Sequence, residues 1–127
     1  MQSSFSITNK TRGTLPKVSF VRIKNAVMGK DYCLSLVFIG ENKSKSLNKI
    51  HRGKNKPTNI LSFPLDKKNG EVFMTPSLAR KEAKLFGRKY DNFMAFLFIH
   101  GLLHLKGMKH SSRMEKTEKK LRKKFGV

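Results

Sequence analysis

Acidic side chains are scarce in this chain of 127 residues: 8 Asp and Glu stand against 28 Lys and Arg, giving a formal net charge of +20. Solubility requires much less charge, so an excess of this size predicts a polyanionic partner, most simply nucleic acid or a ribonucleoprotein. A lysine-rich proteome that places basic residues on every surface is the alternative. The run of basic residues near the C-terminus favours the polyanion.

Cysteine is almost absent as well, and long apolar runs are missing. Cys33 is the only cysteine, which excludes an intrachain disulfide and predicts a reducing, cytoplasmic location. Residues 1–10 lack a charged segment followed by an apolar run, so we expect no signal peptide. The longest apolar run, residues 93–105, is too short to span a bilayer and predicts a buried helix, with no membrane partner.

The length suits a single domain over residues 1–127, and a hydrophobic fraction of 38% is enough for a small core. Periodicity and breaker residues predict strands at 4–8, 32–39, 58–65 and 71–74, the last two forming a hairpin, and helices at 15–28, 42–51, 76–86, 90–105 and 114–125. Within these, Leu47 and Ile50 are expected to face inward, and Pro64 to mark a strand end or edge. This order predicts an α+β fold: a small mixed β-sheet of about four strands with helices packed on it.

Three of the four histidines lie between residues 96 and 110. His100 and His104 share one face of the expected helix, and Gly107 is expected to end it so that the chain brings His110 towards them. Three imidazoles without a fourth protein ligand are typical of a catalytic zinc site. The alternative is that the histidines are satisfied core side chains, although three imidazoles in an apolar stretch need partners for their ring nitrogens.

Two long motifs carry a family resemblance. The segment His100-Gly-Leu-Leu-His-Leu-Lys-Gly-Met-Lys-His110 resembles the signature of the YbeY family, bacterial endoribonucleases of ribosomal RNA maturation whose metal is held by three histidines. Leu47-Asn-Lys-Ile-His-Arg-Gly-Lys-Asn-Lys-Pro-Thr-Asn-Ile-Leu-Ser-Phe-Pro64 is similar to its second hallmark, and Gly70-Glu71-Val72 to its Gly-Asp-Ile. The resemblance covers residues 45–112 and implies one Zn²⁺ per chain. Imidazole ligands alone do not choose among zinc, nickel and copper.

The resemblance also implies catalytic roles. Arg52 matches the family arginine, and a guanidinium can hold phosphate at two points, although a surface arginine is the alternative. Glu71 takes the acidic position of Gly-Asp-Ile and is a candidate general base. Its alternatives are a surface charge at a strand end and a mechanism in which a ribose 2′-hydroxyl is the nucleophile. Gly101 stands where zinc proteases of the His-Glu-x-x-His type carry their base, so a protease is disfavoured. This glycine leaves space for a bulky substrate or permits close helix–sheet packing.

Several further residues are expected around the cleft. His51 replaces the usual family aromatic and is expected at the surface or in a stack, while Thr58, Ser62 and Phe63 are expected to shape the cleft. Residues expected to contact nucleic acid are Arg52, Lys54, Lys56, Lys109, Lys119, Lys120, Arg122 and Lys123.

The resemblance therefore implies a metal-dependent single-strand endoribonuclease that matures ribosomal RNA ends and serves ribosome quality, with the ribosome, in particular its small subunit, as partner. Three family acids are replaced here by Asn55, Asn59 and Lys109, and the last change removes a possible partner of the metal-binding His110. These replacements support the alternative, an RNA- or ribosome-binding assembly factor with the same fold and little or no nuclease activity. A metal hydrolase with another substrate is disfavoured by the charge. The oligomeric state is left open.

Overall fold

The structure, a computed structural model, describes residues 4–127. Its centre is one four-stranded sheet with the strand order β1-β2-β4-β3. The first two neighbouring pairs are parallel and the hairpin of β3 with β4 is antiparallel, so the expected mixed sheet and its hairpin are confirmed. The strands are β1 (Phe5–Asn9), β2 (Cys33–Phe38), β3 (Ile60–Pro64) and β4 (Asn69–Met74).

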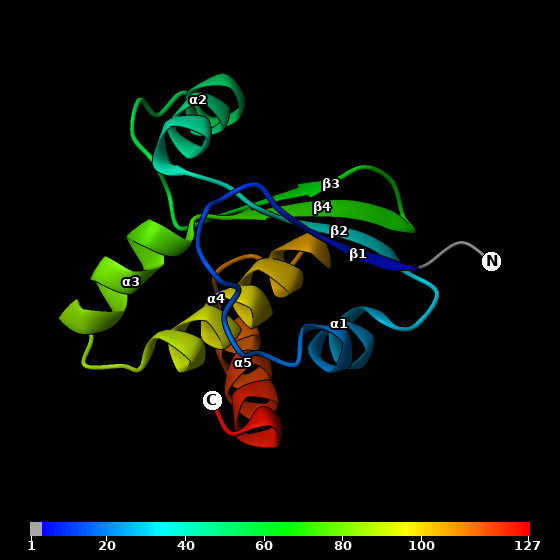
Figure 1. Cartoon of the computed structure of the whole chain (residues 1–127). Helices are drawn as coiled ribbons and strands as arrows, with labels where there is room; N and C mark the ends of the chain where they lie inside the picture. Colours follow the sequence, from blue (N-terminus) through cyan, green and yellow to red (C-terminus); the bar gives the residue numbers. More distant parts are fainter. Residues whose placement is uncertain (1–3) are drawn as a thin grey trace.

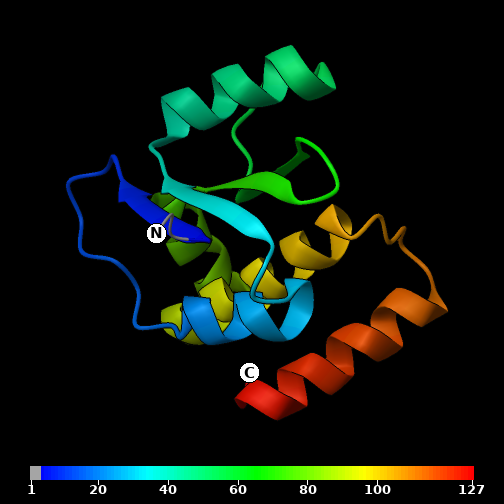
Figure 2. The same cartoon turned by 90° about the vertical axis from the view of Figure 1, so that its right-hand side faces the viewer.

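In residues 4–127, five helices cover the two faces of this sheet unequally. Figures 1 and 2 show α2 alone on one face, with α1, α3, α4 and α5 on the other. The arrangement confirms the expected α+β fold. Within residues 4–127, no helix has both the length and the hydropathy needed to cross a membrane. The helices are α1 (Phe20–Met28), α2 (Glu41–Arg52), α3 (Pro76–Leu85), α4 (Tyr90–Leu105) and α5 (Ser112–Phe125).

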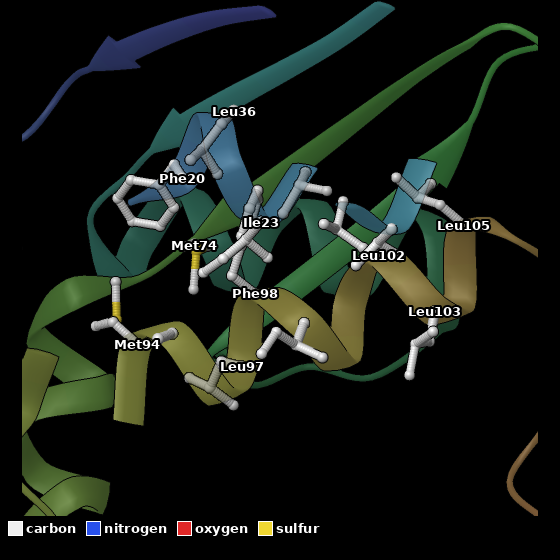
Figure 3. Close-up of a cluster of buried hydrophobic side chains, with 14 of the residues drawn as sticks. Phe20, Ile23, Leu36, Met74, Met94, Leu97, Phe98, Leu102, Leu103 and Leu105 are labelled. Carbon is white, nitrogen blue, oxygen red and sulfur yellow. The ribbon is translucent and has the colours of Figure 1, made fainter. Parts of the chain in front are cut away.

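The core is built around α4, which is apolar on nearly every side and has the expected bounds. Phe98 and Leu102 of this helix are fully buried, as are Leu36 of β2 and Met74 of β4. Figure 3 shows these side chains meeting between the helices and the sheet. Since full burial of such a side chain contributes about 1.5–3 kcal/mol, α4 is held firmly against the sheet. Polar side chains projecting from α4 are thereby fixed in position.

The last helix docks on the core as its sequence predicts. The hydroxyl of Ser111 accepts a hydrogen bond from the backbone N–H of Met114, which caps the start of α5. Met114 is 2% exposed, and Leu121 and Phe125 pack against the core from the same helix. One face of α5 therefore lies against the body of the protein.

Two expected features differ from the structure. The first helix begins at Phe20 instead of residue 15. Pro16 is buried, and the backbone N–H of Lys17 donates to Oδ1 of Asp91 in α4. This distant carboxylate takes an N–H at the expected helix start, and residues 15–19 form neither helix nor strand.

The second difference is the inner face of α2. Ile50 is 72% exposed, so its expected inward orientation is wrong, while Leu47 is half-buried. Ser44 and Asn48 are buried instead. The Ser44 hydroxyl donates to the carbonyl of Thr58 and accepts from its N–H, at 2.8 and 2.9 Å, and the Asn48 amide donates to the carbonyl of Lys56 at 2.8 Å. Polar contacts therefore tie α2 to the chain that leads into β3.

Candidate metal centre and cleft

The three histidines of the sequence motif converge. His100 and His104 project from α4, and Gly107, with φ of 85°, turns the chain so that His110 returns to them. The Nε2 atoms of His100 and His104 lie 3.1 Å apart, and one ring nitrogen from each of the three residues lies within 4.8 Å of the others. The predicted cluster and the predicted role of Gly107 in forming it are confirmed.

The donor set suits a cation. Nδ1 of His100 lies 3.0 Å from Oε2 of Glu118. A carboxylate only accepts hydrogen bonds, so Nδ1 carries the hydrogen and the lone pair of Nε2 faces Nε2 of His104. Two imidazole nitrogens bound tetrahedrally to zinc at 2.0–2.1 Å lie about 3.3 Å apart. The observed 3.1 Å separation therefore fits two ligands of one ion.

The pKa of His104 is lowered from its ordinary value, mainly because the ring is partly buried. Electrostatic interactions with His100, His110 and Arg52 lower the pKa further, while a backbone hydrogen bond with Met108 raises it. A lowered pKa keeps the imidazole neutral at physiological pH. Neutral imidazole is the form that binds metal, so the surroundings of His104 favour metal binding.

The histidines line one side of a pocket of about 520 Å³. Its other side is formed by the end of α2 and by the edge strand β3 with the residues before it. Arg52 is thus brought to the histidines, as are the three motif residues expected to shape the cleft. The lining residues are His51, Arg52, Thr58, Asn59, Ile60, Leu61, Ser62, Phe63, His100, Gly101, His104 and His110.

Gly101 allows α4 to approach β3 closely. A Cβ at this position would lie 2.5 Å from Cδ1 of Ile60 and 2.9 Å from Oγ of Ser62. The Ser62 hydroxyl also donates a hydrogen bond to the Gly101 carbonyl at 3.0 Å. Of the two explanations for this glycine, close helix–sheet packing is the one that the contacts support.

Glu71 is not brought to the cluster, contrary to its expected role as a base there. It pairs with Phe63 in the sheet, whereas Val72 of the same strand is buried on the face that carries α4. Successive side chains of a strand point to opposite faces, so Glu71 lies on the face that carries α2. It lines a separate pocket with Cys33. Among residues 4–127, no carboxylate lines the pocket of the histidines.

His51 stacks on Phe63 and does not belong to the cluster of three histidines. Its ring centroid lies 4.5 Å from that of Phe63, with the ring planes tilted by 48°. Phe63 in turn makes an edge contact with Phe73 at 5.8 Å. The stack lies on the α2 face of the sheet and borders the pocket.

Apart from Arg52, which lines the pocket, the basic residues expected to contact RNA divide into two groups. Six lysines are exposed: one pair in the loop after α2, one beside His110, and three along α5. Arg122 is half-buried, and its guanidinium lies over the ring of Phe96 at 5.1 Å. Its expected role in RNA binding therefore competes with an internal contact. The six lysines are Lys54, Lys56, Lys109, Lys119, Lys120 and Lys123.

Glu118 is the site residue that the sequence did not reveal. It belongs to neither family motif and lies in a strongly basic helix. A signal was nevertheless present: Glu118 stands four residues after Met114 and three before Leu121, which puts it on the buried face of the helix. Asn59 stands where the family has an acid, and its side-chain amide donates a hydrogen bond to the carboxylate of Glu82 in α3 at 3.4 Å.

Fold and site together define a class of protein. It is a strongly basic α+β protein whose cleft contains three histidines that could hold a metal ion. A sequence model of the family described as "Endoribonuclease YbeY" matches residues 2–126. The chain belongs to the endoribonuclease YbeY family.

Individual relatives agree with this assignment. The protein named Endoribonuclease YbeY from Onion yellows phytoplasma (strain OY-M) is 35% identical over 123 residues, covering 90% of this chain and 80% of the relative. That of Alkaliphilus metalliredigens (strain QYMF) is 30% identical over 132 residues, covering 95% and 85%. The solution structure of TM1509 from Thermotoga maritima matches with a TM-score of 0.65 at 24% identity, over 92% and 85% of the two chains. This last likeness shows the shared fold.

Proposed function

We propose that this protein is a zinc-dependent endoribonuclease that cuts single-stranded RNA and takes part in maturing the ends of ribosomal RNA. The observation that carries the proposal is the convergence of His100, His104 and His110 with Arg52 in one pocket. Membership of the endoribonuclease YbeY family supports RNA as the substrate. The net charge of +20 supports a polyanionic substrate independently of any relative.

In this proposal the three histidines hold one zinc ion per chain. When bound, zinc supplies a hydroxide-forming water at neutral pH and polarises a phosphoryl oxygen. The protein's own contribution is to keep the His104 imidazole neutral and to bring the three rings to a common point. The lowered pKa of His104 and the hydrogen bond of His100 to Glu118 support this arrangement.

Arg52 is proposed to bind the phosphate that reacts. It ends α2 and lines the same pocket as the histidines. A guanidinium can donate two parallel hydrogen bonds to phosphate, and fixed positive charge stabilises the charge that develops on phosphoryl oxygens. The Ser44 and Asn48 contacts of α2 hold this arginine beside β3.

Glu71 is left out of the proposed mechanism because it lies on the other face of the sheet. Two nucleophiles stay possible, a water molecule and the ribose 2′-hydroxyl. The product ends distinguish them: attack by the 2′-hydroxyl leaves a 2′,3′-cyclic phosphate, whereas hydrolysis by water leaves none. Analysis of the ends produced from a short single-stranded RNA therefore decides between the two routes.

We extend the proposal to the partner and the location. The exposed lysines and the net charge support binding to ribosomal RNA within a ribosomal particle, in particular the small subunit. A single cysteine supports a reducing, cytoplasmic compartment. The alternative of an inactive assembly factor is not favoured, because Glu118 supplies a carboxylate partner to the histidine cluster despite the loss of the acid at Lys109.

The test is metal content and RNA cleavage of the purified chain and of two variants. We expect about one zinc per chain in the wild type, with loss of zinc and of cleavage but not of RNA binding in His104→Ala. His51→Ala is the matched control, since His51 lines the same pocket without belonging to the cluster, and should retain zinc. A folded wild type that takes up no zinc would contradict the proposal.

A further inference from the structure

We infer that Glu118 is a positioning residue for the metal centre: it accepts the Nδ1–H of His100 and so directs Nε2 of that ring at the metal. The inference rests on the proposed function in one respect, that the three histidines hold a metal. It adds a residue from outside both family motifs, contributed by α5.

The contact is short and largely shielded from solvent. Nδ1 of His100 and Oε2 of Glu118 are 3.0 Å apart, and the two side chains are 26% and 13% exposed. Glu118 is brought there by helix docking, since Met114, one turn earlier on the same face of α5, is buried in the core. The carboxylate therefore has a defined position relative to α4.

The charges around Glu118 give the carboxylate a second effect. Arg88 and Arg122 both lie over the ring of Phe96, at 4.8 and 5.1 Å, and Phe96 stacks on His100 with centroids 6.2 Å apart. Burial lowers the pKa of Arg88, Arg122 lowers it further, and Glu118 raises it. Two guanidinium groups thus stand near a cluster that is to bind a cation, and Glu118 offsets part of their repulsion.

Histidine ligands of metals ordinarily donate their second N–H to a carboxylate or carbonyl group, which fixes the tautomer and raises the basicity of the ligand nitrogen. In this chain Lys109, beside His110, cannot play that part. Glu118 can, because its carboxylate accepts from His100. The structure accordingly assigns the support of His100 to Glu118, an acid at another place in the sequence from the family acid that Lys109 replaces.

The test measures zinc affinity of the full chain by competition with a chromophoric chelator, at fixed pH and ionic strength. We expect Glu118→Ala to weaken zinc binding by about 10–100-fold, the usual effect of removing such a partner. Glu118→Gln should lie between, because its amide oxygen accepts a hydrogen bond but carries no charge. Glu115→Ala is the control: Glu115 is exposed on the same helix, and its replacement removes the same charge, so zinc affinity should be unchanged.

A second readout separates positioning from mere tethering of α5. In the metal-free protein, the nitrogen shifts of His100 in long-range ¹H–¹⁵N spectra report which ring nitrogen carries the hydrogen. Wild type should show the Nδ1–H form, and Glu118→Ala should show an increased share of the Nε2–H form, with the amide spectrum of α5 otherwise retained. A purely structural role would leave the tautomer unchanged.

The outcomes distinguish this inference from the proposed function. Suppose that wild type binds zinc. If Glu118→Ala then binds zinc as tightly as wild type, or if Glu115→Ala weakens zinc binding as much as Glu118→Ala does, the inference alone is overturned. An unchanged His100 tautomer in Glu118→Ala overturns it as well. A wild type that binds no zinc overturns both the proposed function and the role of Glu118.

Discussion

Replacing Gly101 by alanine would put a methyl group where α4 meets β3. That carbon would stand 2.5 Å from Cδ1 of Ile60 and 2.9 Å from Oγ of Ser62. Gly101 is buried, and its carbonyl accepts the 3.0 Å hydrogen bond from Ser62. Either the helix and strand must separate, or Ile60 and Ser62 must turn to other rotamers. The first response displaces His100, the adjacent residue, and the second removes the hydrogen bond.

Three contributions set the size of the effect. Alanine favours a helix over glycine by about 1 kcal/mol. Overpacking a close interface costs about 1–3 kcal/mol, and losing the Ser62 hydrogen bond costs about 1 kcal/mol. The free energy of unfolding of Gly101→Ala should therefore fall by about 1–3 kcal/mol. Zinc affinity should fall as well, because His100 moves with the helix.

Urea unfolding of the metal-free protein and chelator competition measure the two effects. In an Ile60→Val background, which lacks Cδ1, Gly101→Ala should cost less, and a double-mutant cycle gives the difference. Gly13→Ala is the control, since the nearest side-chain atom to its Cβ would be 3.8 Å away. If Gly101→Ala is as stable as wild type, or costs the same free energy in the wild-type and the Ile60→Val backgrounds, the packing argument is refuted.

Three further predictions follow from the site and the core. Arg52→Ala should lower kcat/KM for RNA by about 10²–10³-fold with zinc content unchanged. Glu71→Gln should leave cleavage intact, because Glu71 lines another pocket. Steady-state kinetics and metal analysis check both variants. Replacing any exposed α5 lysine that contacts single-stranded RNA, such as Lys120, with Gln should reduce the slope of log K against log salt by about 0.7. Burial lowers the pKa of Lys24 from its ordinary value of 10.5, so the unfolded chain holds this proton more tightly than the folded protein does. The free energy of unfolding should therefore rise with pH up to about 10.5. Urea unfolding should show that this rise is absent in Lys24→Met and kept in the exposed control Lys30→Met.

The sequence predicts well those parts of the fold that depend on contiguous residues. Residues 90–105 form the expected helix because their apolar character on all sides requires burial in any arrangement of the domain. The convergence of the three histidines was predictable for a similar reason, as one helix and one glycine turn bring them together. The hairpin at residues 60–74 likewise follows from neighbouring strands and their turn.

Contacts between distant residues account for the differences. The start of α1 depends on Asp91, 74 residues further along the chain, which accepts from the N–H of Lys17. The polar inner face of α2 depends on the path of the chain near Thr58, to which Ser44 is bonded. Leucine and isoleucine periodicity carries no information about such partners, so Ile50 was expected inside and lies outside.

Glu71 and Glu118 show why it was hardest to predict which carboxylate lies at this site. Strand alternation sets Glu71 on the face opposite Val72, but Phe73 is also apolar, so the sequence does not tell which face receives α4. Helical spacing sets Glu118 on the face of Met114, yet only the docking of α5 against α4 places His100 opposite it. Motif spacing thus locates the three histidines, while tertiary packing decides which acid lies beside them.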